Sequence, residues 1–376
     1  MSNMSMSHIM WIDCFACKNR YPADSVIFEC PECKGPLDII YNYDEIKKHI
    51  LRDEFKLAHI SHWKYWPFYP IHDLSKIVTL YEGGTPLIPS RDKKSYYFKN
   101  EGLNPTGSFK DRGTTIEISH VTEIGVKNIA CATTGNMGAS IAAYAARAQG
   151  VSATFYIPTF ASKIKYVQIA SYGGKIIPVK GTYEDALNLT RELRRQKGIY
   201  LTGDYPYRGE GEKSVGFEII DQLGWRAPDY IVVPVGNGTL FYGVYKALKE
   251  LHIIGLLDRI PHIVAVQAKG CSPVVKAFAN KKRTFIPARK PKTIASAINC
   301  GNPVDGIKAL HALYATHGMA VTVTDKEIRA AQKGLGKEGI YAEPGGATAY
   351  AGALKLKLPG TVVVLVTGHG LKDPFV

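Results

Sequence analysis

Four glycine-containing turns constrain the fold of this chain more than any other feature of its 376-residue sequence. Each turn follows an apolar, strand-like run or opens a helix-like segment, and the run at 362–366 is typical of a buried strand. The turns lie at residues 104–113, 133–136, 235–239 and 367–370. Strand-like and helix-like segments alternate along the chain, which predicts open α/β sheets, and ligands favour the carboxyl edge of such sheets. The pattern therefore predicts an α/β fold with a ligand site built from these turns.

The first turn carries a lysine, Lys110, at the point where a turn passes into a helix. Pro105 and Gly107 indicate the turn, and Asp111 places a negative charge in the first helical turn, where the helix dipole favours it. Most lysines lie on solvated surfaces, so a plain surface lysine at a helix start is the alternative interpretation. A lysine held at such a junction can instead form an imine with a carbonyl compound.

The other turns offer groups that suit anions. The hydroxyls of Thr133 and Thr134 and the amide of Asn136 precede an alanine-rich, helix-like segment, and a helix N-terminus of this kind suits a carboxylate. Gly236 and Gly238 would let main-chain N–H groups approach a phosphate closely. A single glycine-rich turn is most often plain turn chemistry, but four in one chain, one of them with a lysine, indicate a binding site.

Together these segments resemble the fold type II pyridoxal-phosphate-dependent enzymes, and within them most closely the threonine synthases. The matching motifs follow the family order from residue 81 to residue 374, which is most of the chain. They are YEGGTPL at 81–87, NPTGSFKDRG at 104–113, TGN at 134–136, GNG at 236–238, AI at 297–298, GNP at 301–303, EP at 343–344 and TGHGLKDP at 367–374. The lysine segment and the last motif are specific, whereas the other glycine turns are shared across the fold type.

The resemblance implies a cofactor, pyridoxal 5'-phosphate, and a role for each matching residue. Lys110 would form the imine with the cofactor, Asn136 would contact the pyridoxal hydroxyl, and Thr367 would contact the pyridine nitrogen. The cofactor phosphate would lie on a loop that consists of Gly236, Asn237, Gly238, Thr239 and Leu240. A neutral threonine hydroxyl does not hold the pyridine nitrogen as a cation, which implies elimination and replacement chemistry rather than transamination.

The resemblance also implies a reaction, the conversion of O-phospho-L-homoserine and water into L-threonine and phosphate, catalysed by a carbon–oxygen lyase of threonine biosynthesis. Thr133, Thr134 and the N–H groups around Asn136 would bind the substrate carboxylate. Arg208 is the leading candidate for the substrate phosphate, because arginine can bind phosphate through two parallel hydrogen bonds, and Lys213 is a second candidate. A solvated arginine in a polar loop is the alternative for Arg208.

Several positions depart from the family pattern, and they affect the substrate rather than the cofactor. Met137, in the expected substrate site, stands where the family commonly has threonine, and Leu240 stands where it has a second asparagine. Neither side chain can hydrogen-bond a phosphate, and Asp204, at a position that is often asparagine, would repel one when ionised. Residues 345–346 are Gly-Gly in place of Ala-Ser. Two other reactions therefore stay open: a replacement reaction on O-phosphoserine, as in a cysteate synthase, and a hydroxyamino-acid ammonia-lyase.

The N-terminal region contains two C-x-x-C pairs with twelve residues between them, a spacing that is typical of a zinc site with four thiolates. The predicted ligands are Cys14, Cys17, Cys30 and Cys33. Four thiolates leave no open coordination position, so the sequence predicts a structural zinc; disulfides or free thiols are the alternatives. The remaining cysteines lie in apolar contexts typical of inert core residues, and they are Cys131, Cys271 and Cys300.

The formal charge of +14 and the basic stretch at 281–292 raise a different class of function, a nucleic-acid-binding protein on an inactive scaffold. Net charge bears on solubility and non-specific attraction rather than on chemistry, so we expect a small-molecule enzyme with no nucleic-acid partner. No apolar run reaches the length that spans a membrane, and residues 1–10 lack a hydrophobic signal core. We expect a cytoplasmic protein that does not associate with membranes.

The domain organisation follows from the resemblance, which implies two open-sheet domains like those of the tryptophan synthase β subunit and its fold type II relatives. We expect a disordered leader at 1–10 and a zinc-knuckle module at 11–43. A large cofactor-binding domain would combine 44–99 with 175–376, and a small mobile domain would span 100–174. Homologous enzymes of this type are often dimers, which implies a homodimer.

Overall fold

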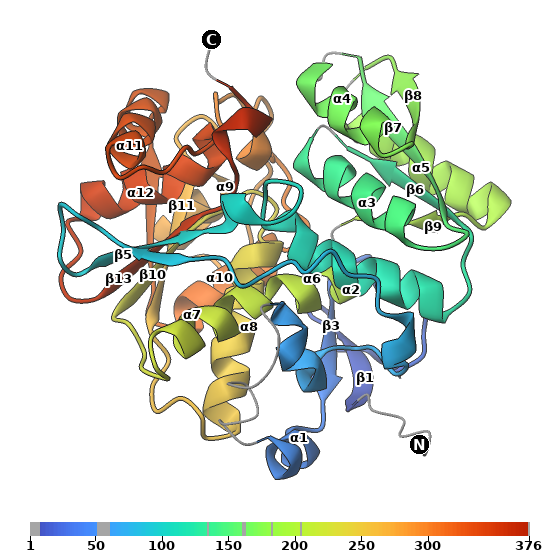
Figure 1. The fold of residues 1–376 in the computed structure, drawn as a ribbon, viewed down its shortest axis with the longest axis horizontal. Helices are drawn as coiled ribbons and strands as arrows, with labels where there is room; N and C mark the ends of the chain where they lie inside the picture. The colour runs from blue at the N-terminus through green and yellow to red at the C-terminus, as the bar shows by residue number, and fades with distance from the viewer. Residues whose placement is uncertain are drawn as a thin grey trace.

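A computed structural model describes residues 8–50, 61–133, 135–159, 163–181, 183–203 and 205–374 of the chain. These residues form a three-stranded, a four-stranded and a six-stranded sheet, with helices packed around them (Figure 1). The two larger sheets are open and mainly parallel, in agreement with the α/β fold expected from the sequence. Five short 3-10 segments connect these elements, and they are η2 (His62–Phe68), η3 (Leu74–Lys76), η4 (Glu101–Leu103), η5 (Ser296–Ile298) and η6 (Gly370–Lys372).

The N-terminal module is an antiparallel sheet with the strand order β2-β1-β3. Its elements are β1 (Ile9–Cys14), β2 (Arg20–Pro22), β3 (Leu37–Tyr41) and the following helix α1 (Tyr43–His49). Strand β1 ends at the first cysteine, and β3 begins four residues after the last one. Strand β1 starts at Ile9, so the last two residues of the leader expected at 1–10 belong to a strand; residues 1–7 lie outside the described part of the chain.

The six-stranded sheet forms the centre of the larger part of the molecule, with the order β12-β11-β10-β13-β5-β4. Its strands are β4 (Leu87–Pro89), β5 (Tyr96–Asn100), β10 (Tyr230–Pro234), β11 (His262–Ala268), β12 (Met319–Val323) and β13 (Val362–Val366). All neighbours run parallel except the edge strand β4. The helices of this part are α6 (Pro206–Glu212), α7 (Ser214–Gln222), α8 (Thr239–Ile253), α9 (Pro273–Ala279), α10 (Gly306–Ala315), α11 (Asp325–Lys337) and α12 (Pro344–Leu356).

Strand β13 explains why this part of the sequence is continuously apolar. Val363 and Leu365 belong to the core formed with α7, α8 and α10, whereas Val362, Val364 and Val366 belong to the core formed with α11 and α12. A strand covered by helices on both faces has no solvent-facing side, so polar residues are excluded from all five positions. Its carboxyl end then delivers residue 367 to the sheet edge.

The four-stranded sheet is parallel throughout and has the order β8-β7-β6-β9. Its strands are β6 (Asn128–Ala132), β7 (Ser152–Pro158), β8 (Lys175–Val179) and β9 (Tyr200–Leu201), and its helices are α3 (Asn136–Arg147), α4 (Lys163–Ser171) and α5 (Tyr183–Lys197). They form the green lobe of Figure 1. A boundary at residue 174 separates β7 from its partner β8. We therefore propose a small domain that continues through β9.

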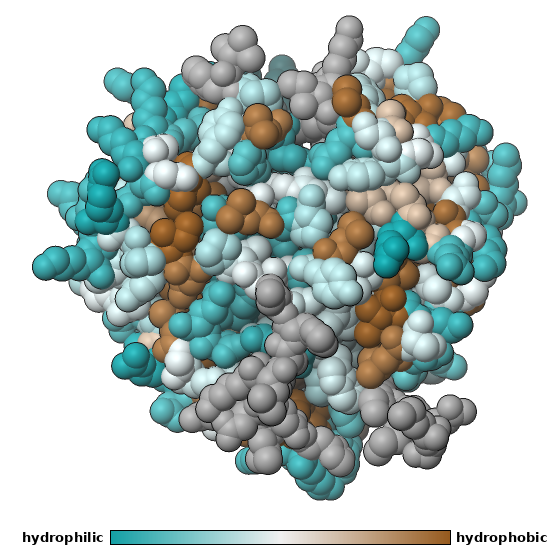
Figure 2. Space-filling view, in the orientation of Figure 1, coloured by the Kyte–Doolittle hydropathy of each residue, from teal (hydrophilic) through white to brown (hydrophobic). Residues whose placement is uncertain are grey.

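Polar and apolar side chains are interspersed over the face of the molecule seen in Figure 2, where the hydrophobic residues form separate patches. Within the described ranges, no helix has the length and apolar character needed to cross a membrane.

Helix α2 (Lys110–Glu123) is anchored by a buried ion-pair cluster centred on Arg112. The Arg112 Nε lies 2.6 Å from Glu101 Oε2, and its Nη1 lies 2.8 Å from Glu218 Oε2 in α7. Glu218 also accepts a hydrogen bond of 2.5 Å from the buried Lys99 in β5. Burial alone would raise the pKa of Glu101, but the Arg112 guanidinium holds that pKa below its usual value. The cluster joins α2, and with it Lys110, to the six-stranded part of the molecule.

Replacing Arg112 with leucine should lower the free energy of unfolding by about 3–5 kcal/mol, because two buried carboxylates would lose their cation. Urea unfolding followed by circular dichroism measures this change. Arg91→Leu is the matched control: Arg91 pairs with Asp92 at 3.1 Å on the surface with 69% of its side chain exposed, so its loss should change stability by less than about 1 kcal/mol. Equal unfolding midpoints for the two variants would contradict the anchoring role.

Candidate active site

Two of the predicted turns lie side by side at the carboxyl edge of the six-stranded sheet. Strands β10 and β13 are parallel neighbours, with Val232 paired to Val364. The turn at 235–238 follows β10, and the turn at 367–370 follows β13. Because parallel neighbours end at the same edge, the register places the predicted phosphate loop beside Thr367.

The lysine turn is bonded directly to the turn after β13. Ser108 and Gly368 form an antiparallel bridge. The Phe109 N–H donates to the Thr367 carbonyl at 3.1 Å, and the His369 N–H donates to the Gly107 carbonyl at 2.9 Å. Lys110 follows at once as the first residue of α2. Two segments more than 250 residues apart in the sequence therefore meet as a short piece of sheet.

Asn136 joins the same cluster from the N-terminus of α3. Its Nδ2 donates to both carboxylate oxygens of Glu343, at 2.9 and 3.0 Å, and the Glu343 N–H donates to the Gly368 carbonyl at 3.0 Å. The Asn136 Oδ1 is buried and has no hydrogen-bond partner among the described residues. Since the carboxylate orients the amide nitrogen, the oxygen is the atom left to accept a hydrogen bond from a ligand.

Two side chains of α6 fix the position of Lys110. The Lys110 Nζ lies 3.2 Å from Glu212 Oε1, and 17% of the lysine side chain is exposed, so the amine remains accessible. The Arg208 Nε lies 3.4 Å from the same Glu212 oxygen, and its Nη2 donates to the Lys110 carbonyl at 3.0 Å. Glu212 therefore lies between the two cations and orients the lysine amine.

The loop at 236–240 has the backbone geometry of an anion site. Gly238 caps α8 with a φ of 95°, a left-handed conformation that favours glycine, and a Cβ there would approach the Asp305 carbonyl to 2.9 Å. The first N–H groups of α8 have no partners within the helix, and the positive end of its dipole lies there. The Asn237 Oδ1 accepts from the Val304 N–H at 2.6 Å. Leu240 is buried in the hydrophobic core, so this loop would bind a phosphate mainly through its backbone.

The residues predicted to bind a substrate carboxylate are partly engaged in local structure. The Thr133 Oγ1 accepts from the N–H groups of Gly135 and Gly138, both at 3.1 Å, and so caps α3. Met137 is half-buried against the core of the four-stranded sheet. Thr134 and Asp204 lie outside the described residues.

Arg208 and Lys213, the candidates for a substrate phosphate, are fully buried and lie beside carboxylates. The Arg208 Nη1 is 3.1 Å from Glu117 Oε2. The Lys213 Nζ is 2.5 Å from Glu210 and 2.9 Å from Glu250. Both positive charges are thus already matched within the fold, and phosphate binding by either residue stays a prediction.

Two residues of the cluster, Glu343 and Glu212, had no predicted role. Glu343 stands in the Glu-Pro motif at a helix start, a signal that could have identified it. Glu212 has no such signal, because only the tertiary packing of α6 against α2 brings it to Lys110.

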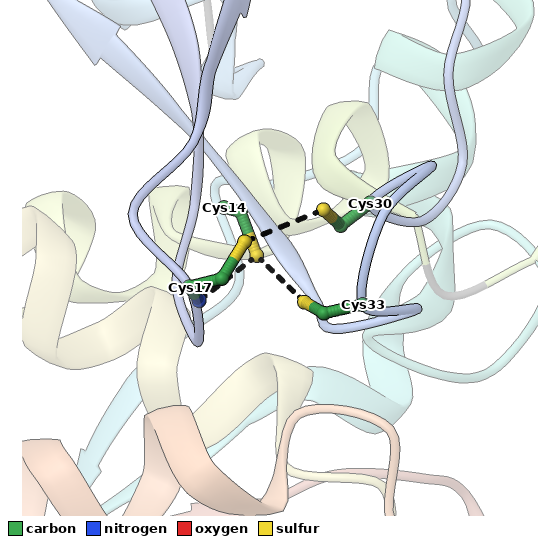
Figure 3. Close-up of side chains that lie close together, drawn as sticks. All are labelled: Cys14, Cys17, Cys30 and Cys33. Atoms are coloured by element: carbon green, nitrogen blue, oxygen red, sulfur yellow. Dashed lines mark hydrogen bonds between the residues drawn. The ribbon is translucent and has the colours of Figure 1, made fainter.

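The four cysteines form a second site at the N-terminus (Figure 3). Their sulfur atoms point toward one another from two turns and all lie within 4.8 Å. Two of the contacts, Cys14 to Cys33 at 3.4 Å and Cys17 to Cys30 at 3.6 Å, are near the separation of about 3.8 Å that follows from tetrahedral Zn–S bonds of about 2.3 Å. Burial would raise the pKa of Cys30, but hydrogen bonds from the Cys33 backbone and the Tyr21 hydroxyl lower it to about 6. The donor set and its geometry fit a structural zinc ion.

The main site fits pyridoxal phosphate on three observations: an accessible lysine amine, a buried amide oxygen that lacks a partner in the described chain, and a glycine cradle at a helix N-terminus. A family model described as pyridoxal-phosphate dependent enzyme matches residues 78–368. The fold and the site thus define the class, and the chain belongs to the pyridoxal-phosphate-dependent enzymes.

Individual relatives narrow the assignment. The chain is 44% identical over 376 residues to a threonine synthase from Methanocaldococcus jannaschii, with 96% of this chain and 92% of the relative covered. It is 43% identical over 380 residues to a threonine synthase from Methanosarcina acetivorans, with the same coverage. The chain is therefore a member of the threonine synthase family, whose enzymes are lyases.

Solved structures support the fold alone, because their sequence identities are low. A maize serine racemase matches with a TM-score of 0.67 and 24% identity, covering 78% of this chain and 89% of that chain. A bacterial-type match, the T.th. threonine deaminase, has a TM-score of 0.65 and 23% identity, covering 76% of this chain and 92% of that chain.

Gly368→Ala should weaken cofactor binding at least tenfold, because a Cβ at this position would lie 2.4 Å from Glu343 Oε1 and would displace the carboxylate that orients Asn136. Titration of the cofactor-free protein with pyridoxal phosphate measures the change. Gly336→Ala, in the exposed part of α11 where a Cβ meets no atom within 4 Å, is the matched control and should bind normally. Unchanged affinity in Gly368→Ala would remove Glu343 from the site.

Proposed function

We propose that this protein converts O-phospho-L-homoserine and water into L-threonine and phosphate, as a pyridoxal-phosphate-dependent lyase. The single observation that carries the proposal is the convergence of Lys110, Asn136 and Thr367 through backbone and side-chain hydrogen bonds at the sheet edge that also holds the 236–240 loop. The threonine synthase relatives, which align over almost their whole length, support the choice of reaction.

Bound pyridoxal phosphate supplies an electron sink for negative charge that develops on the substrate carbons. Lys110 would hold the cofactor covalently and, once released by the substrate, would move protons at the substrate carbons. Asn136 Oδ1 would accept from the pyridoxal hydroxyl, and the backbone of Gly236, Asn237, Gly238, Thr239 and Leu240 would bind the cofactor phosphate. The neutral hydroxyl of Thr367 would leave the pyridine nitrogen without a full positive charge, which favours elimination over transamination.

We propose a positioning role for Arg208 and Glu212. Their contacts with the Lys110 carbonyl and amine fix the start of α2, so the lysine amine points in one direction. Direct binding of the substrate phosphate by Arg208 would require it to leave Glu117, which would then be a buried carboxylate without its cation. Lys213 would need to leave Glu210 and Glu250 in the same way.

A second candidate reaction rests on two apolar positions. Met137 and Leu240 cannot donate hydrogen bonds to a phosphorylated substrate, and Leu240 is buried in the core. A β-replacement reaction on O-phosphoserine or a hydroxyamino-acid ammonia-lyase would need fewer polar groups here. The threonine synthase relatives favour the first reaction.

We propose that Cys14, Cys17, Cys30 and Cys33 bind one structural zinc ion. The fit of the four sulfur atoms to a tetrahedron supports this assignment. Elemental analysis should find about one zinc per chain, and metal-free protein with disulfides would refute it. Cysteines that bind metal suit a reducing compartment, so we propose a cytoplasmic enzyme. A homodimer and the absence of a nucleic-acid partner also remain proposals.

Lys110→Ala should abolish the visible absorbance of the bound cofactor and lower turnover by at least about 100-fold, because the proposed covalent link and the proton-transfer group are both lost. Borohydride treatment of the normal protein followed by peptide mass spectrometry should find the cofactor attached to Lys110. The exposed Lys94→Ala is the control and should keep both properties. Full turnover in Lys110→Ala would end the catalytic assignment.

The reaction itself is tested with three substrates offered to the same preparation. We expect release of phosphate together with threonine from O-phospho-L-homoserine. Faster turnover of O-phosphoserine with sulfite would support the replacement reaction instead, and release of ammonia from threonine would support the ammonia-lyase.

A further inference from the structure

Asp305, which directly precedes α10, supports the 236–240 loop through three contacts. Its N–H donates to the Asn237 carbonyl at 3.0 Å, and its Oδ2 accepts from the Thr239 hydroxyl at 2.7 Å. Its carbonyl oxygen lies where a Cβ on Gly238 would approach to 2.9 Å. Three consecutive residues of the loop therefore take their positions from one aspartate, so a shift of Asp305 would move the loop.

Lys308 connects Asp305 to the cysteine module. Its Nζ lies 3.1 Å from Asp305 Oδ1 and donates to the carbonyl of Leu37 at 2.9 Å. The lysine is buried, and its Nζ also lies 4.6 Å from the centre of the Tyr242 ring. A buried ammonium depends on all of its partners, because water cannot replace a partner that moves away.

Leu37 belongs to the part of the chain that the cysteine turns shape. It pairs with Cys14 across β1 and β3. The two residues before it also close the cysteine turns: the Cys30 N–H donates to the Gly35 carbonyl at 2.9 Å, and the Phe15 N–H donates to the Pro36 carbonyl at the same distance. The position of the Leu37 carbonyl is therefore set by both cysteine turns.

The module also contacts α8, the helix that starts at the loop. Asp38 accepts from the Tyr242 hydroxyl at 2.6 Å and from the Lys246 Nζ at 2.8 Å. The Phe15 ring, between the first two cysteines, packs edge-on against Tyr242 with centroids 5.7 Å apart. Burial alone would raise the pKa of Asp38, but Lys246 and Lys308 hold that pKa well below its usual range.

From these contacts we infer that Lys308 and Asp305 are positioning residues that couple metal binding at the four cysteines to pyridoxal-phosphate binding at the 236–240 loop. The inference rests on the proposed function, because it takes both ligands to bind where we propose. When the metal leaves, the cysteine turns lose the ion that holds them together, the Leu37 carbonyl moves, and Lys308 no longer holds Asp305 under the loop. Coupling of this kind is reciprocal, so the cofactor also tightens metal binding.

The test measures pyridoxal-phosphate affinity in the full-length protein with and without zinc. Zinc removal by a chelator should weaken the cofactor roughly 5–30-fold in the normal protein. Lys308→Met should weaken it by a similar factor while keeping its zinc. In Lys308→Met, zinc removal should have little further effect, since the connection is already broken.

Two further variants separate the coupling from a general loss of structure. Lys308→Arg keeps the charge and donors and should restore most of the affinity and of the zinc effect. Lys333→Met, at an exposed position of α11, should behave as the normal protein does. If Lys308→Met does not fold, as judged by thermal unfolding, Asp305→Asn replaces it with the same expected outcome.

The possible failures are distinct. If the normal protein binds no pyridoxal phosphate, the proposed function is wrong. If it binds the cofactor equally well with and without zinc, or if zinc removal and Lys308→Met multiply as independent effects, the coupling is wrong while the proposed function stands.

Discussion

The short piece of sheet between residues 107–109 and 367–369 is the interaction on which the site depends. Its backbone hydrogen bonds place Lys110 beside Thr367 without relying on any side chain. Glu343 adds Asn136 to the same unit by bonding to both the asparagine amide and the Gly368 carbonyl. The first turn of α2, the N-terminus of α3 and the end of β13 thereby form one rigid group, as is required of a site that must hold a cofactor in one orientation.

Buried charges then attach this group to the rest of the molecule. Arg112 joins α2 to α7 through Glu218, and Arg208 joins α6 to α2 through Glu117. A similar cluster, with Lys246 paired to Asp38 and Glu210, connects the cysteine module to α8 and α6. Each buried ion carries a desolvation cost that only its partners offset, so these contacts specify how the elements dock more than they add stability. The N-terminal module is thus continuous with the structure that supports the loop at 236–240.

Local patterns were enough to predict the class of the fold and much of the site. Gly238 could be assigned to a helix-opening turn because only glycine adopts its conformation without strain, and the continuous apolar run of β13 indicates a strand covered on both faces. The cysteine spacing indicated the cluster that the structure contains. In contrast, the surroundings of Arg208 were not predictable, since the carboxylate that it meets, Glu117, comes from a helix 91 residues away in the sequence.

The sequence by itself determined which chemical groups are available: a lysine at a helix start, glycines where backbone must approach a phosphate, and four thiols in two pairs. Each of these depends on neighbours within a few residues, so local chemistry is sufficient to identify them. Only the tertiary structure decided how they are used, because the docking of distant elements sets which charges are already paired. It placed Glu212 beside Lys110, paired Arg208 and Lys213 with buried carboxylates, and connected the cysteine turns to the 236–240 loop through Lys308.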